Sequence, residues 1–391
     1  MDVAAWRARG RIALLGVCVA YAALAIGRSD RQLVDSDWTA FATGASLAAG
    51  PRPELLYDRA DQQRAQDAIT GGGSFDLKGQ GRLLPFLSPP WVALLAIPFG
   101  AAGFGWGGRL LLLVGLAALL AGVALAAPAD RWAPVVVAAS FPTLVLLLNV
   151  QLDGLVALGL GACIAAERSG RPVVAGLALG LTLVKPHLVV PVAAALLLTR
   201  RWRLLGGWGV AALGLVAVAS ARQASWMGSW LGATAATVGR NGRELDPGTW
   251  PWLLVGSGPR PLLTLALSLA VLAAVLAVAM RGHGEPWAAL VAGGVIVAPH
   301  ALPSDLVLVG LAMAIDGRSG VGAWAVFAAA AAAAAVAPDP WPSLIATGLV
   351  GSLLLRIALR PPAGRSPRWD RRMPASIRAA LPARRRAGSR G

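Results

Sequence analysis

Long apolar runs, separated by short polar breaks, fill most of this chain. Because an α-helix rises 1.5 Å per residue, about 20 apolar residues are enough to cross the hydrocarbon core of a membrane. The runs therefore predict a series of transmembrane helices. The candidate spans lie near residues 12–27, 87–103, 109–127, 153–167, 172–185, 188–199, 204–220, 261–280, 287–299, 304–316, 321–337 and 342–359.

Three segments interrupt this pattern. Residues 28–85 and 221–260 are long and polar, which predicts two extended loops. Residues 133–148 are apolar but carry Pro142 near the middle, where a proline breaks a helix. This segment is predicted to be a broken or re-entrant element that lines a cavity, because irregular backbone at membrane depth is tolerated only there.

The arginines predict the orientation, because short loops rich in arginine stay on the cytoplasmic side. These segments are WRARGR before the first span, ERSGR at 167–171, RRWR at 200–203, RGHGE at 281–285, DGRSG at 316–320 and the C-terminal tail. Both long polar segments then face outward, and about twelve spans leave both termini in the cytoplasm. A crossing by 133–148 would place ERSGR outside, which favours the re-entrant interpretation.

Composition agrees with this pattern. Hydrophobic residues make up 57% of the chain and charged residues 14%, whereas a soluble domain has about half and about a quarter. The predicted fold is an all-α polytopic membrane protein, with one transmembrane domain over 1–360 and an Arg-rich, disordered cytoplasmic tail over 361–391. The net charge of +16 resides in the short loops and this tail, which suits anionic lipid headgroups and argues against nucleic acid.

Other local motifs point to structure rather than chemistry. The N-terminus has the basic-then-apolar pattern of a signal peptide, but the many spans that follow favour an uncleaved first helix. Cys18 and Cys163 lie in apolar runs, so a disulfide is not expected. No cysteine or histidine cluster has zinc spacing, and no metal is predicted. The glycine run at 103–108 lacks the lysine of a phosphate loop and predicts a tight turn.

Polar residues beside the spans are candidate functional groups, because charges at membrane depth are costly. In the predicted orientation, residues from four separate stretches converge on the outer side. They are Asp35, Asp37, Asn149, Gln151, Asp153, Lys185, His187, His300 and Asp305. Since the inner side is nearly all arginine, this set predicts a constructed polar site.

Asp37 is the first candidate for a general base. A partly desolvated carboxylate at the mouth of a cavity can take a proton from an alcohol. The alternative is the N-cap of the helix that begins WTAFATG, a position that Asp favours, and the two roles are compatible. Asp35 fits an exposed loop acid better and is the second candidate for the base.

Lys185 ends an apolar run on the outer side, where a compact cation suits a phosphate or pyrophosphate group. The alternative is a lysine that reaches to the lipid headgroups. His187 and His300 are further candidate phosphate ligands, and a structural hydrogen bond is the alternative for His300.

The remaining polar residues are candidates for supporting roles. Asp305 either orients His300 or caps the next helix. Gln151 and Asp153 either contact a sugar hydroxyl or stabilise the broken element that precedes them.

Three motifs, in this order, resemble glycosyltransferase family 87. The first is DWTAFATGASLAAG, followed by ELLYD and LLPFLSPPWVALLAIPF. The second is the central block from NVQLDG through LTLVKPH to LLLTRRWR, and the third is APHALPSDLVLVGLAMA. The resemblance covers roughly residues 30 to 315, and the chain departs from the family where relatives often have Gly-Gln and it has Val150-Gln151.

The resemblance implies a bundle of the glycosyltransferase C class that needs no cofactor. Such an enzyme would transfer a hexose, typically mannose, with inversion from a polyprenyl-phosphate donor to a lipid or cell-envelope glycan acceptor. The reaction would take place on the outer face of the plasma membrane. By the resemblance, Asp37 matches the catalytic acid position, and Lys185 and His300 match positions near the donor phosphate.

Two alternatives to a transferase remain from the sequence. A transporter or flippase of envelope lipids would need the same buried charges but would gain nothing from two long outer loops. A non-catalytic partner in an envelope-assembly complex is the other.

Overall fold

The computed structural model describes residues 3–72, 83–240, 261–281, 286–298, 301–337 and 341–359. Every regular element in these ranges is a helix, and most of the helices are apolar. Backbone amides in a hydrocarbon environment must find partners within their own segment, which an α-helix provides. The architecture is that of a membrane protein, as predicted.

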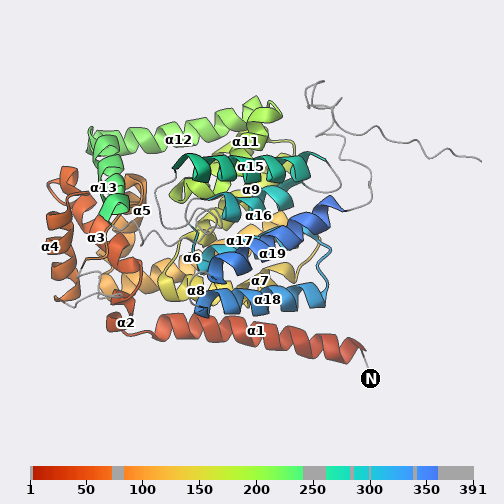
Figure 1. Cartoon of the computed structure of the whole chain (residues 1–391). Coiled ribbons are helices and arrows are strands. Elements are labelled where there is room, and N and C mark those ends of the chain that lie inside the picture. Colours follow the sequence, from red (N-terminus) through yellow and green to blue (C-terminus); the bar gives the residue numbers. More distant parts are fainter. Residues whose placement is uncertain are drawn as a thin grey trace, which may run out of the picture.

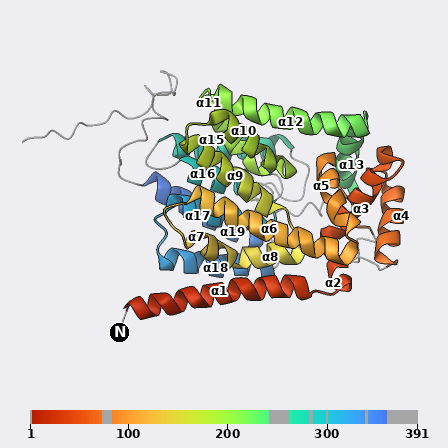
Figure 2. The same ribbon diagram turned by 180° about the vertical axis from the view of Figure 1, so that it is seen from behind.

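Most of the helices run side by side in one bundle (Figures 1 and 2). They are α1 (Val3–Gly27), α6 (Phe104–Ala126), α7 (Ala133–Ala138), α8 (Phe141–Asn149), α9 (Asp153–Arg168), α10 (Pro172–Leu179), α11 (Val190–Leu198), α12 (Trp202–Arg222), α15 (Pro261–Met280), α16 (Pro286–Val297), α17 (Val307–Asp316), α18 (Val321–Val336) and α19 (Trp341–Ala358). Short 3₁₀ helices interrupt the bundle at η2 (Gly180–Val184), η3 (Pro186–Val189) and η4 (Pro303–Leu306). Within the described ranges, Arg9–Gly27, Phe104–Ala126 and Trp202–Arg222 are each long and apolar enough to cross a membrane alone.

A group of shorter helices caps one end of the bundle, opposite the N-terminus (Figure 1). We call this group the platform. It consists of α2 (Asp30–Val34), α3 (Trp38–Ala49), η1 (Pro53–Leu55), α4 (Arg59–Thr70), α5 (Pro90–Ala101) and α13 (Trp226–Arg240). The described parts of the two predicted loops are therefore largely helical.

Side-chain contacts fix the platform. The Trp91 and Trp226 rings meet edge to face at 5.7 Å, and the indole N–H of Trp91 donates to the Leu183 carbonyl of η2 at 3.0 Å. The Asp58 carboxylate accepts the Asp61 N–H at 2.9 Å and caps α4, and this hydrogen bond holds the pKa of Asp58 below its usual value. The contact of Trp91 joins the platform directly to the bundle.

One predicted span and the predicted re-entrant element differ in the structure. The run near 87–103 forms the 12-residue α5, about 18 Å long, which packs on α3 in the platform. The segment 133–148 does break, but it forms α7 and α8, which follow one another along α1 rather than folding back (Figures 1 and 2). The re-entrant interpretation of 133–148 is therefore not supported. The apolar run that lies outside the bundle is α5, which belongs to the platform.

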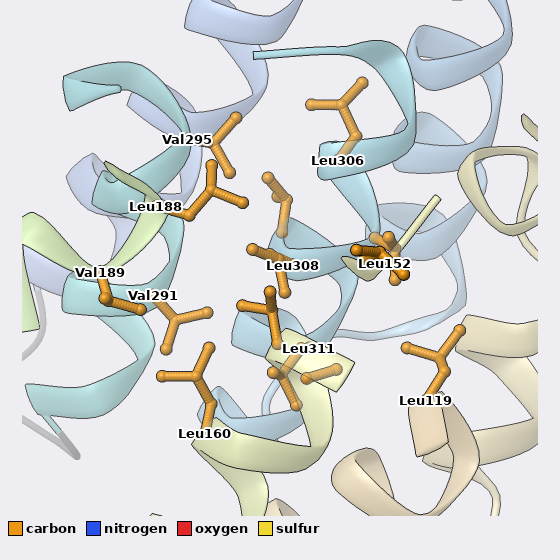
Figure 3. Packing of buried hydrophobic residues seen from close by; sticks show 14 of the residues in the cluster. Leu119, Leu152, Leu160, Leu188, Val189, Val291, Val295, Leu306, Leu308 and Leu311 are labelled. Carbon is orange, nitrogen blue, oxygen red and sulfur yellow. The ribbon is translucent and has the colours of Figure 1, made fainter. Parts of the chain in front are cut away.

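The centre of the bundle is a dry apolar core. Figure 3 shows buried leucine and valine side chains of this core, which come from separate helices and include Leu119, Leu160, Leu188, Val291 and Leu308. All five are almost completely buried. This core fixes the relative positions of the elements that carry the polar residues.

Glycines let α6 and α9 pack with their backbones in contact. A Cβ atom at Gly154 would overlap with the Gly115 carbonyl oxygen, and one at Gly161 would overlap with the Gly122 carbonyl oxygen. Each helix presents two glycines seven residues apart, which is the small-residue packing typical of membrane helices. This contact, the glycine seam, holds α9 and the residue that begins it, Asp153, close to α6.

Candidate active site

The turn between α8 and α9 carries the centre of the polar cluster. Val150 ends α8 in a left-handed conformation, with φ 54° and ψ 48°, which is uncommon for a β-branched residue. The following Gln151, Leu152 and Asp153 are all buried. Strained backbone of this kind is concentrated at functional sites. Here it aims the side chains of Gln151 and Asp153 at two different partners.

The first partner is Asp37, at the start of α3. The Gln151 side-chain amide donates to Oδ2 of Asp37, and the Asp37 backbone N–H donates to the Asn149 carbonyl at 3.2 Å. Asp37 occupies the N-cap position of α3, but its side chain makes no capping hydrogen bond. The Asp37 carboxylate therefore faces the α8–α9 turn, while Asp35 is exposed two residues earlier.

Neighbouring side chains hold the segment before α3 in place. The Arg28 guanidinium donates to the Leu148 carbonyl of α8 at 2.5 Å, and the Trp38 indole donates to the Phe104 carbonyl of α6 at 2.7 Å. Arg109 of α6 donates to the Arg28 carbonyl at 2.5 Å and pairs with Asp30 at 3.0 Å. The backbone at Asp37 is thus fixed from α6 and α8.

Arg28 is a supporting residue that the sequence predictions missed. It is one of six arginines in the segment 28–85, so the sequence pattern does not distinguish it from the others.

The second partner of the turn is Lys185. Its ammonium group lies 2.8 Å from Oδ1 of Asp153 and 2.7 Å from Oδ1 of Asp305. Both aspartates are buried, and the lysine side chain is only 13% exposed. Three elements distant in the sequence therefore meet in one ionic cluster of two carboxylates and one ammonium group.

Prolines next to Lys185 and Asp305 explain the backbone conformation of two of the three cluster residues. Pro186 disfavours the helical conformation for the residue before it, and Lys185 accordingly has φ −140° between η2 and η3. Pro303 begins η4, in which Oδ2 of Asp305 accepts the Leu302 N–H at 2.6 Å. Asp305 thus caps its helix, as one predicted alternative has it, and also binds Lys185. Asp153 is the first residue of α9, where the helix dipole favours a negative charge.

The predicted histidines are placed only in part. His187 lies in η3, two residues after Lys185, and is half-buried. His300 lies outside the described residues. No group of three or more His, Cys, Asp or Glu side chains that could hold a metal occurs among the residues that the structure describes. The metal-free site stays a prediction.

The geometry brings together Asp37, Gln151, Asp153, Lys185 and Asp305 around one turn. The sequence model of Glycosyltransferase family 87 matches residues 86–303, more than half of the 391 residues. The chain belongs to glycosyltransferase family 87. No curated protein and no solved structure matches it.

The matched region contains most of the cluster. Gln151, Asp153 and Lys185 lie within 86–303, whereas Asp37 precedes the region and Asp305 follows it by two residues. The link of Asp37 to the family region is structural, through the hydrogen bonds to Gln151 and Asn149.

Proposed function

We propose that this glycosyltransferase moves a hexose, with mannose as the first expectation, from a polyprenyl-phosphate donor to a lipid or cell-envelope glycan acceptor. The single observation that supports the assignment of the site is the turn at residues 150–153, which holds Asp37 on one side and Lys185 on the other. Family membership favours this transferase over a lipid transporter or flippase.

Asp37 is the proposed general base. The Gln151 amide and the fixed backbone at Asn149 orient its carboxylate, so that the acceptor hydroxyl can lose its proton to Asp37 while it attacks the anomeric carbon. The bond from the anomeric carbon to the phosphate oxygen breaks on the opposite face, and the polyprenyl phosphate leaves. One in-line displacement gives inversion.

Lys185 is proposed to act at the leaving phosphate, with His187 and His300 as further candidates. An ammonium group has three N–H donors, and the two carboxylates account for two of them. The third would serve the donor phosphate, whose charge increases as the bond breaks. Because two acids already surround Lys185, its second role is to hold Asp153 and Asp305 in place.

We infer that the platform faces outward and that both termini are cytoplasmic in a plasma-membrane protein. The arginine-rich segments support this orientation. Cysteine labelling tests it in a variant in which Cys18 and Cys163 are replaced by Ala. A cysteine at exposed Ser169 should react only from the inside, and one at exposed Ser225 only from the outside. Labelling of Ser169→Cys from outside would reverse the orientation.

Turnover of two asparagine variants tests the base. Asp37→Asn keeps an oxygen for the Gln151 amide but cannot take the proton, so turnover should fall by roughly 100-fold or more. Donor affinity should barely change. The control, Asp35→Asn, removes an exposed acid two residues away and should keep most of the activity. Near-normal turnover in both variants would refute the assignment, and loss only in Asp35→Asn would move the base by two residues.

A further inference from the structure

A half-open cavity of about 250 Å³ lies between α17, α18 and α19. On α19 its wall is formed by Leu349, Ser352, Leu353 and Arg356, whose spacing places them on one helix face. The first turns of α18 form a second wall, from Gly322 to Phe327, and α17 adds Val309 and Met313.

The polar end of this cavity is cationic. Arg356 donates to Asp316 Oδ2 at 3.1 Å and to Ser319 Oγ at 2.8 Å through one nitrogen, and its Nε has no hydrogen-bond partner among the described residues. Arg318 is exposed and lies beside Ser319 in the loop between α17 and α18. Two arginines against one aspartate leave a net positive charge, and a guanidinium has five N–H donors, enough to bind an anion while it keeps Asp316.

The rest of the cavity is apolar and open. Val326 is 64% exposed, and a Cβ atom at Gly322 would meet nothing within 4 Å. Arg356 and Leu349 are seven residues apart on α19, which corresponds to about 10 Å along the helix. A groove of this length with a cation at one end has the form of a headgroup site joined to a site for part of one acyl chain.

We propose that this cavity binds an anionic phospholipid. The phosphate would contact the exposed part of the Arg356 guanidinium and the Arg318 side chain, and one acyl chain would lie along α19 toward Leu349. Asp305 lies in η4, directly before α17, and shares Lys185 with Asp153, which begins α9. The helices α9 and α17 therefore begin at the same end of the bundle and end at the opposite one. The lipid site therefore lies at the end opposite the platform, among the arginine-rich segments that are predicted to face the cytoplasmic leaflet.

Native mass spectrometry of the full chain in detergent tests the proposal. Phosphatidylglycerol is titrated against phosphatidylcholine with the same acyl chains. The unaltered protein should retain phosphatidylglycerol with about tenfold higher affinity, as one charge-assisted contact would give. Arg356→Gln should lose this preference. Gly322→Leu, which fills the groove and keeps every charge, should weaken the binding of both lipids.

Matched variants exclude general effects. Gly348→Leu adds the same side chain at an exposed position of α19 that does not line the cavity, and Arg171→Gln removes an exposed arginine at the same end. Both should bind lipid as the unaltered protein does. Should Arg356→Gln fail to fold, Gly322→Leu decides alone. Equal binding of the two lipids, unchanged binding in Gly322→Leu, or a preference for polyprenyl phosphate would overturn the proposal.

Discussion

The two ends of the bundle differ in how their acidic side chains are paired with cations. Near the platform, Lys185 lies between Asp153 and Asp305, and the neutral amide of Gln151 holds Asp37. In the part of the chain that the structure describes, this group contains three carboxylates and one ammonium group.

At the opposite end, two acids each pair with an arginine. Glu167 pairs with Arg201 and also accepts the Trp287 indole N–H at 2.9 Å, and Asp316 pairs with Arg356. These contacts connect the ends of α9 and α17 to neighbouring elements.

This difference distinguishes charges that serve the reaction from charges that only hold helices together. The pair of Glu167 and Arg201 needs no explanation beyond holding the helices. Two buried carboxylates that share one ammonium group are costly, because both lose their hydration and only one cation lies between them. Costly charges in a membrane protein are concentrated where a substrate or a proton is handled. The acid excess near the platform is therefore the stronger sign of a catalytic site.

The largest expected effect follows from removing the ammonium group that lies between Asp153 and Asp305. Lys185→Met leaves two buried carboxylates facing each other, and the free energy of unfolding should fall by about 3–5 kcal/mol. Thermal unfolding in detergent measures it.

Adding Asp153→Asn to Lys185→Met should recover much of this stability but not donor affinity, if Lys185 also binds the phosphate. Arg201→Met is the comparison at the opposite end, and it should cost less, since Glu167 keeps its Trp287 hydrogen bond. Unchanged stability in Lys185→Met would contradict the ionic cluster.

An intermediate effect is expected at the glycine seam, which holds Asp153 in the acidic group. Gly154→Ala places a methyl group against the Gly115 carbonyl and should lower the free energy of unfolding by about 1–3 kcal/mol. Turnover should fall as well, because Asp153 moves with its neighbour. Gly214→Ala, where a Cβ atom meets nothing within 4 Å, should be neutral or stabilising. Equal stability of the two variants would show that α6 and α9 are not in backbone contact.

The smallest expected effect concerns the orientation of Asp37. Gln151→Leu removes the amide that binds Asp37 and should reduce turnover about tenfold, with a small change in unfolding temperature. Steady-state kinetics with a fixed donor concentration measures it. The control is Gln63→Leu, which removes a similar amide–carboxylate contact to Asp67, 3.0 Å long, within α4. If both variants keep full turnover, the contact to Gln151 has no catalytic role.

Much of the site could be predicted from the sequence, because charged residues stand out against apolar runs. The convergence of Asp37, Gln151, Asp153, Lys185 and Asp305 was predicted in this way. Their pairing was not, because Lys185 and Asp305 are 120 residues apart and only the tertiary packing brings them together.

The fold was predicted in class and less well in detail. Hydrophobicity cannot distinguish a helix that crosses a membrane from one that lies in a platform, and α5 was assigned as a span for that reason. The length of its helix, limited by Pro90 and by Gly103 with φ 83°, was the missing information. The glycine seam was also missed, although the spacing of Gly115 and Gly122 against Gly154 and Gly161 was visible in the sequence.

One measurement tests most directly whether the acidic group near the platform does the chemistry. Turnover and unfolding temperature are measured together for Asp37→Asn and for Glu167→Gln, an acid of the balanced pair at the opposite end. Asp37→Asn should lose roughly 100-fold or more in turnover at an unchanged unfolding temperature, whereas Glu167→Gln should unfold at a lower temperature and keep turnover within a few-fold. Near-normal turnover in Asp37→Asn, or an equal loss in both variants, would contradict the account.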